Sequence, residues 1–275
     1  MQTYMQTKAI LSLVYKLVNE SNFILFGGIV RDIIIPSVSK GLDPFEKKFK
    51  PDAEISDIDM TFVPDEKYST DLSTRVNDMF PKFREWDWRV NTLQHITTYG
   101  GNGLRIFISH CWAEIVTHID FVPLSTSHQL DFDVNLFRFS KEKGLHTCMR
   151  RSKILLEQIV LFRTSDKIMR KSCKFLLPVV SDDEAKDANS AKRFVKMLKK
   201  GWKIENIGAT ISVVEETKDG ECQICGAVPN GRHIVLTCSS CRLCFDCFQG
   251  LIESKRLDSC ICPTCRQRVV LWTRE

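Results

Sequence analysis

Cysteines are concentrated near the C-terminal end of this 275-residue chain, where nine of the twelve lie between residues 222 and 265. Eight of the nine form four pairs with two residues between the partners, at Cys222/Cys225, Cys238/Cys241, Cys244/Cys247 and Cys262/Cys265. A two-residue spacer lets one turn of chain present both sulfurs to the same ion, and Zn²⁺ is satisfied by four thiolates. The spacing therefore predicts two tetrahedral zinc sites.

Metal thiolates rather than disulfides fit the rest of the chain. A segment of about fifty residues has too little core to fold unaided, and a structural zinc supplies on the order of 10–16 kcal/mol. We expect an intracellular protein, because the apolar stretch after Lys8 ends at Lys16 and carries no cleavage site. Thiols stay reduced there. The isolated Cys111, Cys148 and Cys173 are predicted to be buried structural thiols.

A second group of reactive residues lies in the first half of the chain. Gly27-Gly28 follows a short apolar segment, and a glycine pair between a strand and a helix lets a phosphate approach the backbone N–H groups. Asp57 and Asp59 are two residues apart on a predicted strand, so they project from one face and can bind divalent cations together.

A third carboxylate on a neighbouring strand would complete this acidic site. Asp120 is the first candidate and Glu114 the second. Two Mg²⁺ or Mn²⁺ ions about 3.5–4 Å apart would activate a 3′ hydroxyl and stabilise a leaving pyrophosphate.

The elements that must position these residues follow from the hydrophobic pattern. Helices are predicted over residues 1–20, 29–35 (ended by Pro36), 71–83 and most of 152–202. Strands are predicted over residues 23–26, 56–62, 94–99, 104–109 and 115–122, with residues 100–103 as a hairpin turn rather than a phosphate loop. This pattern predicts an α+β fold in which a mixed sheet with helices precedes a helical neck and a small zinc domain.

Charge is unevenly distributed along the chain. Residues 150–203 carry fifteen Lys/Arg against six Asp/Glu, a surplus of nine, which leaves about −4 for the rest of a chain whose net charge is +5. A positive segment suits a nucleic-acid backbone, although a solvated helical surface is an equal alternative. The basic residues proposed to contact RNA are Arg163, Arg170, Lys171, Lys174, Arg193 and Lys196. No apolar stretch is long enough to span a bilayer, so no membrane contact is expected.

The cysteine-rich segment resembles the RING finger family, with Cys241 in the place of the family's histidine. The resemblance implies a cross-brace, in which Cys222, Cys225, Cys244 and Cys247 bind one zinc and Cys238, Cys241, Cys262 and Cys265 bind the other. Cys260 and His233 are then spare, with Cys260 in place of Cys262, or His233 as a ligand, as the alternatives. The family recruits a ubiquitin-conjugating enzyme, and the positions that match its contact residues are Ile224, Pro263 and Arg266.

The first two hundred residues resemble the nucleotidyltransferases that include bacterial-type poly(A) polymerases and CCA-adding tRNA nucleotidyltransferases. The resemblance rests on residues 26–32 (FGGIVRD) and 57–59 (DID), and extends to residues 129–136, 171–175 and 190–194. It implies transfer of a nucleotide from an NTP, with nucleotide-binding residues at Gly27, Gly28, Arg31, Asp32, Asp131 and Asn135 and catalytic carboxylates at Asp57, Asp59 and Asp120.

The chain also departs from this class. The spacer between Asp32 and Asp57 is 24 residues, about twice the family's length. Gln129-Leu130 stands where the family has an arginine pair. The positions that template the incoming base fall on Thr164, Ser165 and Ile168. Selection of C and then A is therefore not implied.

Together these observations predict four parts: a nucleotidyltransferase-like head (1–148), a basic neck (149–214), a linker (215–221) and a RING-type zinc finger (222–275). The first hypothesis is template-independent nucleotide transfer to an RNA 3′ end, in a protein that also recruits a ubiquitin-conjugating enzyme. The second is a RING-type ubiquitin ligase whose inactive head is an RNA- or protein-binding platform. A third has the head transferring a nucleotide to a protein or small molecule. A RING implies a eukaryotic host or a virus of one.

Overall fold

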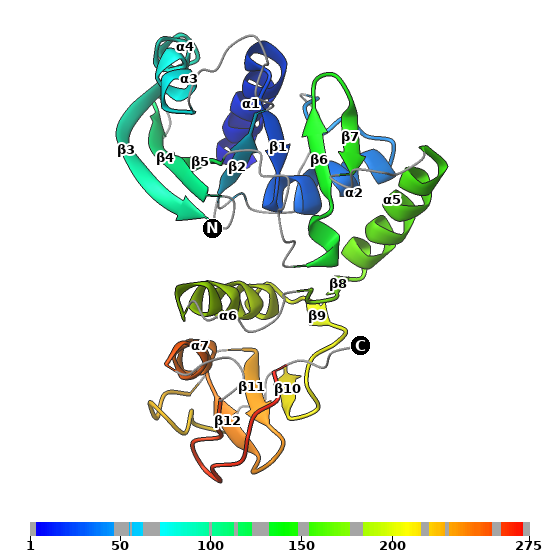
Figure 1. Cartoon of the computed structure of the whole chain (residues 1–275), viewed down its shortest axis with the longest axis vertical. Coiled ribbons are helices and arrows are strands. Elements are labelled where there is room, and N and C mark those ends of the chain that lie inside the picture. The colour runs from blue at the N-terminus through cyan, green and yellow to red at the C-terminus, as the bar shows by residue number, and fades with distance from the viewer. Residues whose placement is uncertain are drawn as a thin grey trace. The chain divides into compact units, whose positions relative to one another are not determined.

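The computed structural model describes residues 4–46, 55, 57–62, 72–98, 101–112, 115–122, 132–147, 154–176, 184–215, 220–228, 231–254 and 260–271. The chain forms two compact units. The first comprises Met1–His128 and Val134–Met169, and the second comprises Gln129–Asp133 and Arg170–Glu275. Both contain helices and strands, so the predicted α+β class is confirmed (Figure 1). No helix among the described residues combines the length and apolar character needed to cross a bilayer.

A seven-stranded mixed sheet forms the centre of the first unit, with its strands in the order β3-β4-β5-β2-β1-β6-β7. Neighbouring strands are antiparallel except β2 and β5, which are parallel and lie at the middle of the sheet. The strands are β1 (Ile24–Phe26), β2 (Ile58–Thr61), β3 (Trp88–Thr98), β4 (Gly101–His110), β5 (Val116–Phe121), β6 (Phe137–Ser140) and β7 (Gly144–Thr147).

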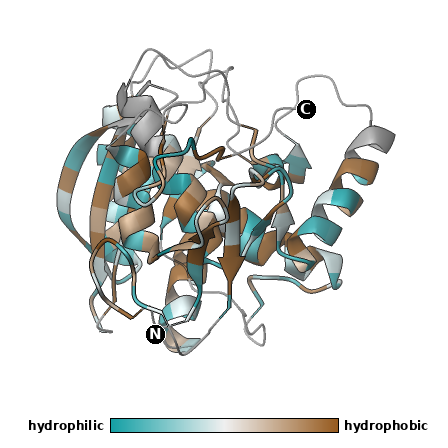
Figure 2. Ribbon diagram, turned by 90° about the horizontal axis from the view of Figure 1, so that it is seen from below, coloured by the Kyte–Doolittle hydropathy of each residue, from teal (hydrophilic) through white to brown (hydrophobic). Residues whose placement is uncertain are grey.

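Apolar residues at helical or alternating spacing form the core of this unit. Helix α1 (Tyr4–Ser21) confirms the predicted helix over 1–20, and it buries the residues of its predicted apolar stripe, Ile10, Leu11, Val14, Leu17 and Val18. Hydrophobic and hydrophilic residues alternate along β3 and β4, at the left of Figure 2. In β4, Leu104, Ile106 and Ile108 are buried, while the residues between them are partly exposed.

The predicted end of a helix at Pro36 is wrong. A wide turn over Val30–Ile34, in which Ile35 N–H donates to Val30 O, leads directly into α2 (Ile35–Ser39). Pro36 directly follows this wide turn, whose local irregularity in the hydrogen-bond ladder accommodates a residue without an N–H group. The helical path therefore runs from Gly28 to Ser39 without interruption.

Two other sequence predictions are refined by the structure. The predicted helix over 71–83 is divided into α3 (Leu72–Asp78) and α4 (Phe80–Glu85). The predicted hairpin turn at 100–103 is displaced, because Gly101, Asn102 and Gly103 already pair with β3 as part of β4. Gly100 lies outside the described residues.

The second unit combines a helix with the cysteine-rich segment. Its elements are β8 (Ser172–Cys173), α6 (Glu184–Lys199), β9 (Lys203–Ile204), β10 (Ile211–Val214), β11 (His233–Leu236), β12 (Cys241–Leu243) and α7 (Phe245–Glu253). Strands β8 and β9 pair in parallel, and β10, β11 and β12 form an antiparallel sheet.

The predicted neck is divided between the two units. Helix α5 (Ile154–Met169) belongs to the first unit, whereas α6 belongs to the second and lies alongside α7 (Figure 1). The apolar stripe of α6 explains this, because Phe194, Val195 and Leu198 are almost fully buried. An ion pair between Lys199 and Asp246 joins the two helices.

The cysteine-rich fold begins before the predicted boundary at residue 222. Strand β10 pairs along its whole length with β11. Just before β10, Gly208 N donates to Leu271 O at 2.9 Å, and Thr210 Oγ1 donates to Val270 O at 3.0 Å. Residues 208–214 are therefore part of the same folded module as the cysteines.

Candidate zinc centres and acidic site

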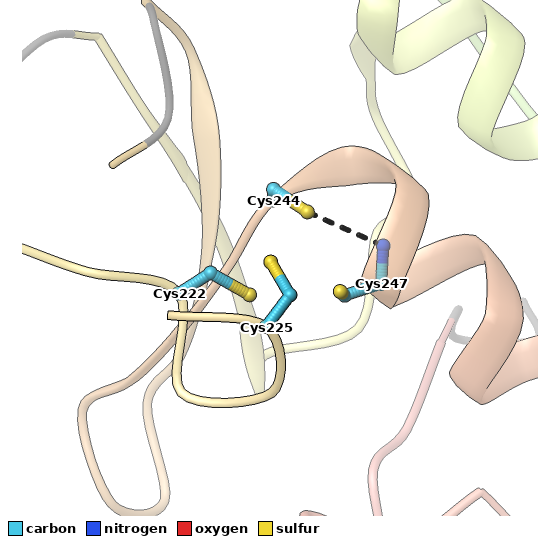
Figure 3. Close-up of side chains that lie close together, drawn as sticks. All are labelled: Cys222, Cys225, Cys244 and Cys247. Carbon is cyan, nitrogen blue, oxygen red and sulfur yellow. Dashed lines mark hydrogen bonds between the residues drawn. The ribbon is translucent and has the colours of Figure 1, made fainter. Parts of the chain in front are cut away.

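Four cysteine thiols gather at the junction between a loop and the start of α7. Cys222 and Cys225 lie on the loop before β11, and Cys244 and Cys247 lie at the N-terminal end of α7. Their four Sγ atoms all lie within 4.8 Å of one another (Figure 3). The first and third pairs of the sequence thus meet, which is the grouping predicted from the cross-brace.

Local backbone geometry holds each pair of this four-thiol group. Gly226 N donates to Cys222 O at 2.8 Å, and Gly226 has a φ of +73°, a left-handed conformation that favours glycine. Cys244 caps α7, with its Sγ accepting a hydrogen bond from Cys247 N at 3.4 Å (Figure 3). The sequence therefore places one pair on a tight turn and the other on a helix start.

The thiols of this group differ in acidity before any metal is bound. Burial alone would raise the pKa of Cys222, but the backbone N–H groups of Cys225, Cys244 and Ile224 together lower it to about 6. Burial raises the pKa of Cys244 and of Cys247. Cys222 is therefore a thiolate at neutral pH, the form that binds a metal ion.

A second group contains three thiols, those of Cys238, Cys262 and Cys265, again with all Sγ atoms within 4.8 Å. Cys262 and Cys265 lie on a turn like the first one, in which Arg266 N donates to Cys262 O at 3.0 Å and Arg266 has a φ of +60°. Hydrogen bonds from the backbone of Cys265 and from Ser239 outweigh the effect of burial, and the pKa of Cys262 is lowered to about 6. Burial raises the pKa of Cys238 to about 11.

Cys241, predicted as the fourth ligand of this second group, lies outside it. It is the first residue of β12, pairs with Leu236 across the sheet and is fully buried. Side chains alternate along a strand, so Cys241 shares the buried face of β12 with Leu243, while Arg242 between them is partly exposed. Its thiol interacts with that of Cys262, so Cys241 lies beside the second group without meeting the mutual 4.8 Å spacing of the other three sulfurs.

The donor sets differ in how well they suit zinc. Four thiols from two tight pairs fit a closed structural site, whereas in the second group three thiols meet the same spacing and that of Cys241 lies beside Cys262. Cys260 and His233 are both buried and belong to neither group. Of the isolated cysteines, Cys173 is buried as predicted. Cys111 is exposed, so the prediction that it is buried is wrong. Cys148 lies outside the described residues.

The residues predicted to contact a conjugating enzyme lie on adjacent loops. Ile224 is 48% exposed, an unusual fraction for an isoleucine, and Pro263 and Arg266 are also exposed. Thr264 Oγ1 donates to Gln223 Oε1 at 2.7 Å, which joins the two turns that carry Ile224 and Pro263. Sequence reasoning did not identify this hydrogen bond.

In the first unit, two of the predicted catalytic carboxylates lie side by side in the middle of the sheet. Asp59 on β2 pairs with Asp120 on β5 and, on its other side, with Phe26 of β1. The Asp59 carboxylate lies against Gly27, the residue that follows Phe26. A Cβ added to Gly27 would come within 2.2 Å of Asp59 Oδ2. Gly27 also has a φ of +72°, so the turn beside Asp59 requires glycine.

The Asp120 carboxylate is paired with an arginine that the sequence reasoning missed. Arg105 on β4 pairs in register with Asp120, and its Nε and Nη2 atoms each donate to one carboxylate oxygen at 2.7 Å. The hydrogen bonds that Arg105 donates to Asp120 are the main cause that raises the pKa of Arg105, and the charges of Asp57 and Asp59 add to it. His110 N donates to Ile115 O at the turn between β4 and β5. Counting residue by residue along the two antiparallel strands from this hydrogen bond places residue 105 opposite residue 120, so the hairpin register would have predicted the contact.

The predicted Mg²⁺ or Mn²⁺ site is not assembled in this arrangement. Across the described residues, which include Asp57, Asp59 and Asp120, groups of three or more metal-ligand atoms within 4.8 Å are formed by cysteines alone. Asp59 lies against Gly27 and Asp120 is paired with Arg105, and the three carboxylates do not meet this spacing. Glu114 and Asp131 lie outside the described residues.

Predicted nucleotide-binding residues far apart in sequence do come together. Arg31 forms a two-point ion pair with Asp32, with Nε–Oδ1 and Nη2–Oδ2 distances of 2.6 Å, and its Nη1 donates to Asn135 Oδ1 at 3.1 Å. Arg31 is only 6% exposed. Its guanidinium therefore links the helix after Gly28 to the segment before β6.

The basic residues predicted to contact RNA fall on both units. Arg163 lies on α5 of the first unit, and Arg170, Lys171, Lys174, Arg193 and Lys196 lie in the second. All are exposed except Lys174, which is partly buried. Thr164 and Ile168, at positions that template a base in the family, are buried in α5 and cannot serve that purpose.

Comparison with known proteins adds no relative. No protein-family model matches the chain, and no curated protein matches it.

Proposed function

We propose that the second unit is a zinc module that recruits a ubiquitin-conjugating enzyme and acts as a RING-type ubiquitin ligase. The observation that carries the proposal is the meeting of Cys222/Cys225 with Cys244/Cys247 beneath an exposed apolar residue, Ile224. In this proposal the first unit is the platform that binds a protein or RNA to be brought near the ligase.

The geometry suits recruitment rather than chemistry by the thiols themselves. In a closed site all four thiolates are bound to zinc, so none is available for chemistry, and the bound ion fixes the loop that carries Ile224. The Gln223–Thr264 hydrogen bond holds the loop with Pro263 beside it. Two apolar side chains on rigid, adjacent loops form a small contact surface whose cost in lost side-chain entropy is low.

The test is a binding titration with the zinc-loaded full chain and a panel of ubiquitin-conjugating enzymes. Ile224→Ala should weaken the Kd by about tenfold or more, because a buried interface anchor contributes over about 1 kcal/mol. Val228→Ala is the matched control, since Val228 is an exposed apolar residue on the same loop, at 55% exposure. Equal affinity of both variants for the conjugating enzyme would show that Ile224 does not make the proposed contact.

Nucleotide transfer by the first unit is a second candidate, favoured by the pairing of Asp59 with Asp120 beside Gly27. A glycine turn that leads into a helix is suited to a triphosphate, and the acids lie next to it. The acceptor would be an RNA 3′ end held by the basic residues, or a protein or small molecule. This candidate ranks second because Asp120 is paired with Arg105 and the three carboxylates do not lie within 4.8 Å of one another.

Incubation with a short RNA, each labelled NTP and Mg²⁺ or Mn²⁺ tests this second candidate. Extension that disappears in an Asp57→Ala/Asp59→Ala variant would establish it. Absence of incorporation with every NTP and both metals would leave the first unit as a binding platform.

A further inference from the structure

The hydroxyl of Thr264 reaches two other parts of the zinc module. Thr264 is the residue after Pro263, and its Oγ1 donates to Gln223 Oε1 at 2.7 Å. Burial raises the pKa of the Cys241 thiol, and a hydrogen bond with the same Thr264 side chain opposes this rise. One hydroxyl therefore joins the second thiol group, beside which Cys241 lies, to the loop that carries Ile224.

The turns of the first and the last cysteine pair are each closed by local hydrogen bonds. Gly226 N donates to Cys222 O at 2.8 Å, and Arg266 N donates to Cys262 O at 3.0 Å. A metal ion in each thiol group adds a further constraint on its own turn. These constraints shape each turn from within, whereas the Thr264 hydroxyl connects one turn to the other.

The Gln223–Thr264 hydrogen bond acts one residue away from both apolar contact positions. Gln223 precedes Ile224, and Thr264 follows Pro263. The backbone of Gln223 is held as well, because its N–H donates to Arg242 O on β12 at 3.0 Å. Gln223 therefore combines a fixed backbone with a side chain that reaches the other turn, and this links the position of one apolar side chain to that of the other.

Both partners of this hydrogen bond are exposed, so water competes for it and its contribution to stability is small. Its effect on binding is different, because holding two contact side chains in place before an encounter lowers the entropy cost of association. We propose that Thr264 is a positioning residue: acting through Gln223, its hydroxyl holds Ile224 at the spacing from Pro263 that a ubiquitin-conjugating enzyme meets. The partner in this inference rests on the proposed function, whereas the arrangement of the loops is a property of the free chain.

Substitutions that separate the hydroxyl from the shape of the side chain test the inference in the zinc-loaded full chain. Thr264→Val keeps the branched shape and should weaken the Kd for the conjugating enzyme by about fivefold, whereas Thr264→Ser keeps the hydroxyl and should stay within about twofold of the wild type. Thr237→Val is the matched control, because Thr237 is also exposed beside a cysteine and its hydroxyl donates to Ala209 O at 3.1 Å. Equal Kd values for Thr264→Val and Thr237→Val overturn the inference.

A double-mutant cycle identifies the route of the effect. Gln223→Leu removes the partner of the hydroxyl and should also weaken binding about fivefold. Adding it to Thr264→Val should weaken binding no further, because both changes break one hydrogen bond. Losses that add, or loss of zinc from either single variant, would assign the effect to something other than this hydrogen bond and overturn the inference.

The Ile224 methyl signal of the free chain gives a readout that needs no conjugating enzyme. In methyl NMR of the zinc-loaded chain, Thr264→Val should shift the Ile224 δ1 resonance and increase the mobility of this methyl group, while Thr264→Ser and Thr237→Val leave both unchanged. A chain with this response whose wild type binds no conjugating enzyme retains the positioning role and loses the proposed function. A chain that binds a conjugating enzyme but shows no response at Ile224 does the opposite.

Discussion

Single residues decide how each pair of thiols is presented. The turns that follow Cys225 and Cys265 share one hydrogen-bond pattern, yet Gly226 occupies the left-handed position in one and Arg266 in the other. A left-handed conformation costs a residue with a side chain about 1–2 kcal/mol. A strained arginine that is retained on the surface points to a use for its side chain.

The first prediction separates these two roles of Arg266. Arg266→Gly should stabilise the zinc module by up to about 1 kcal/mol, because glycine adopts a positive φ without strain. The same change should slow ubiquitin transfer by about tenfold, the effect of losing one charged hydrogen bond. Chemical denaturation and ubiquitin discharge measure the two effects, with exposed Arg268→Ala as control. Unchanged transfer would leave Arg266 without the predicted role.

The second prediction concerns pH and zinc. The pKa values of Cys222 and Cys262 are lowered to about 6, whereas burial raises those of Cys244 and Cys247. Protons on the raised thiols must leave when zinc binds, so affinity falls as pH falls. The fall should steepen below about pH 6, where Cys222 and Cys262 also take up protons. Competition with a chromophoric chelator from about pH 5 to 8 measures this, and a constant affinity would contradict it.

The third prediction concerns Arg105 and Asp120. The Asp120 side chain is 13% exposed and accepts two charged hydrogen bonds, while that of Arg105 is 34% exposed. Arg105→Ala should therefore cost about 2 kcal/mol of unfolding free energy, because Asp120 keeps its charge and loses its partner. Adding Asp120→Ala should recover part of this loss.

Urea denaturation measures this loss, and Arg89→Ala is the matched control. Arg89 is exposed on the neighbouring strand β3, where surface substitutions stay within about 0.5 kcal/mol. Equal losses for Arg105→Ala and Arg89→Ala would show that the ion pair contributes no stability.

At the scale of elements, the C-terminal segment is fixed by a close backbone approach. A Cβ added to Gly208 would lie 1.7 Å from Val270 O and 2.5 Å from Val270 C, both backbone atoms that cannot move aside cheaply. Thr210 Oγ1 accepts from Val270 N at 2.8 Å and donates to Val270 O at 3.0 Å. The strands of the zinc module therefore depend on residues before its first cysteine.

The fourth prediction tests this contact. Gly208→Ala should lower the stability of the second unit by about 3 kcal/mol, the cost of an overpacked site. Gly250→Ala on α7 is the control, because nothing lies within 4 Å of its added Cβ. The control should gain about 0.5–1 kcal/mol from helix propensity. Thermal melts of both variants measure the difference, and equal melting temperatures would contradict the prediction.

Local patterns in the sequence predicted elements better than they predicted contacts between them. The stripe on α1 and the alternation on β4 follow from spacing alone. The path through Pro36 was missed, because the sequence does not reveal the wide turn before Pro36 that lets the helical path continue. The C-x-x-C spacing of Cys241 predicts a ligand of the second group, but the pairing of β12 with β11, which places its side chain on the buried face of the sheet, could not be read from spacing alone.

At the scale of the molecule, the chain combines two units with different sources of stability. The first has a seven-stranded sheet with a large apolar core. The second has small sheets, the aromatic contacts Phe132–Phe175 and Phe175–Phe194, and two thiol groups. Basic residues lie on both, so RNA binding, where it occurs, need not be confined to one unit.

Single-turnover discharge of ubiquitin tests whether the zinc module makes this chain a ubiquitin ligase. The full chain with bound zinc is mixed with a conjugating enzyme charged with ubiquitin, and transfer to free lysine is timed. We predict acceleration that Ile224→Ala abolishes and Val228→Ala preserves. The contradicting result is discharge at the unassisted rate with every conjugating enzyme tested, from a chain shown to hold its zinc.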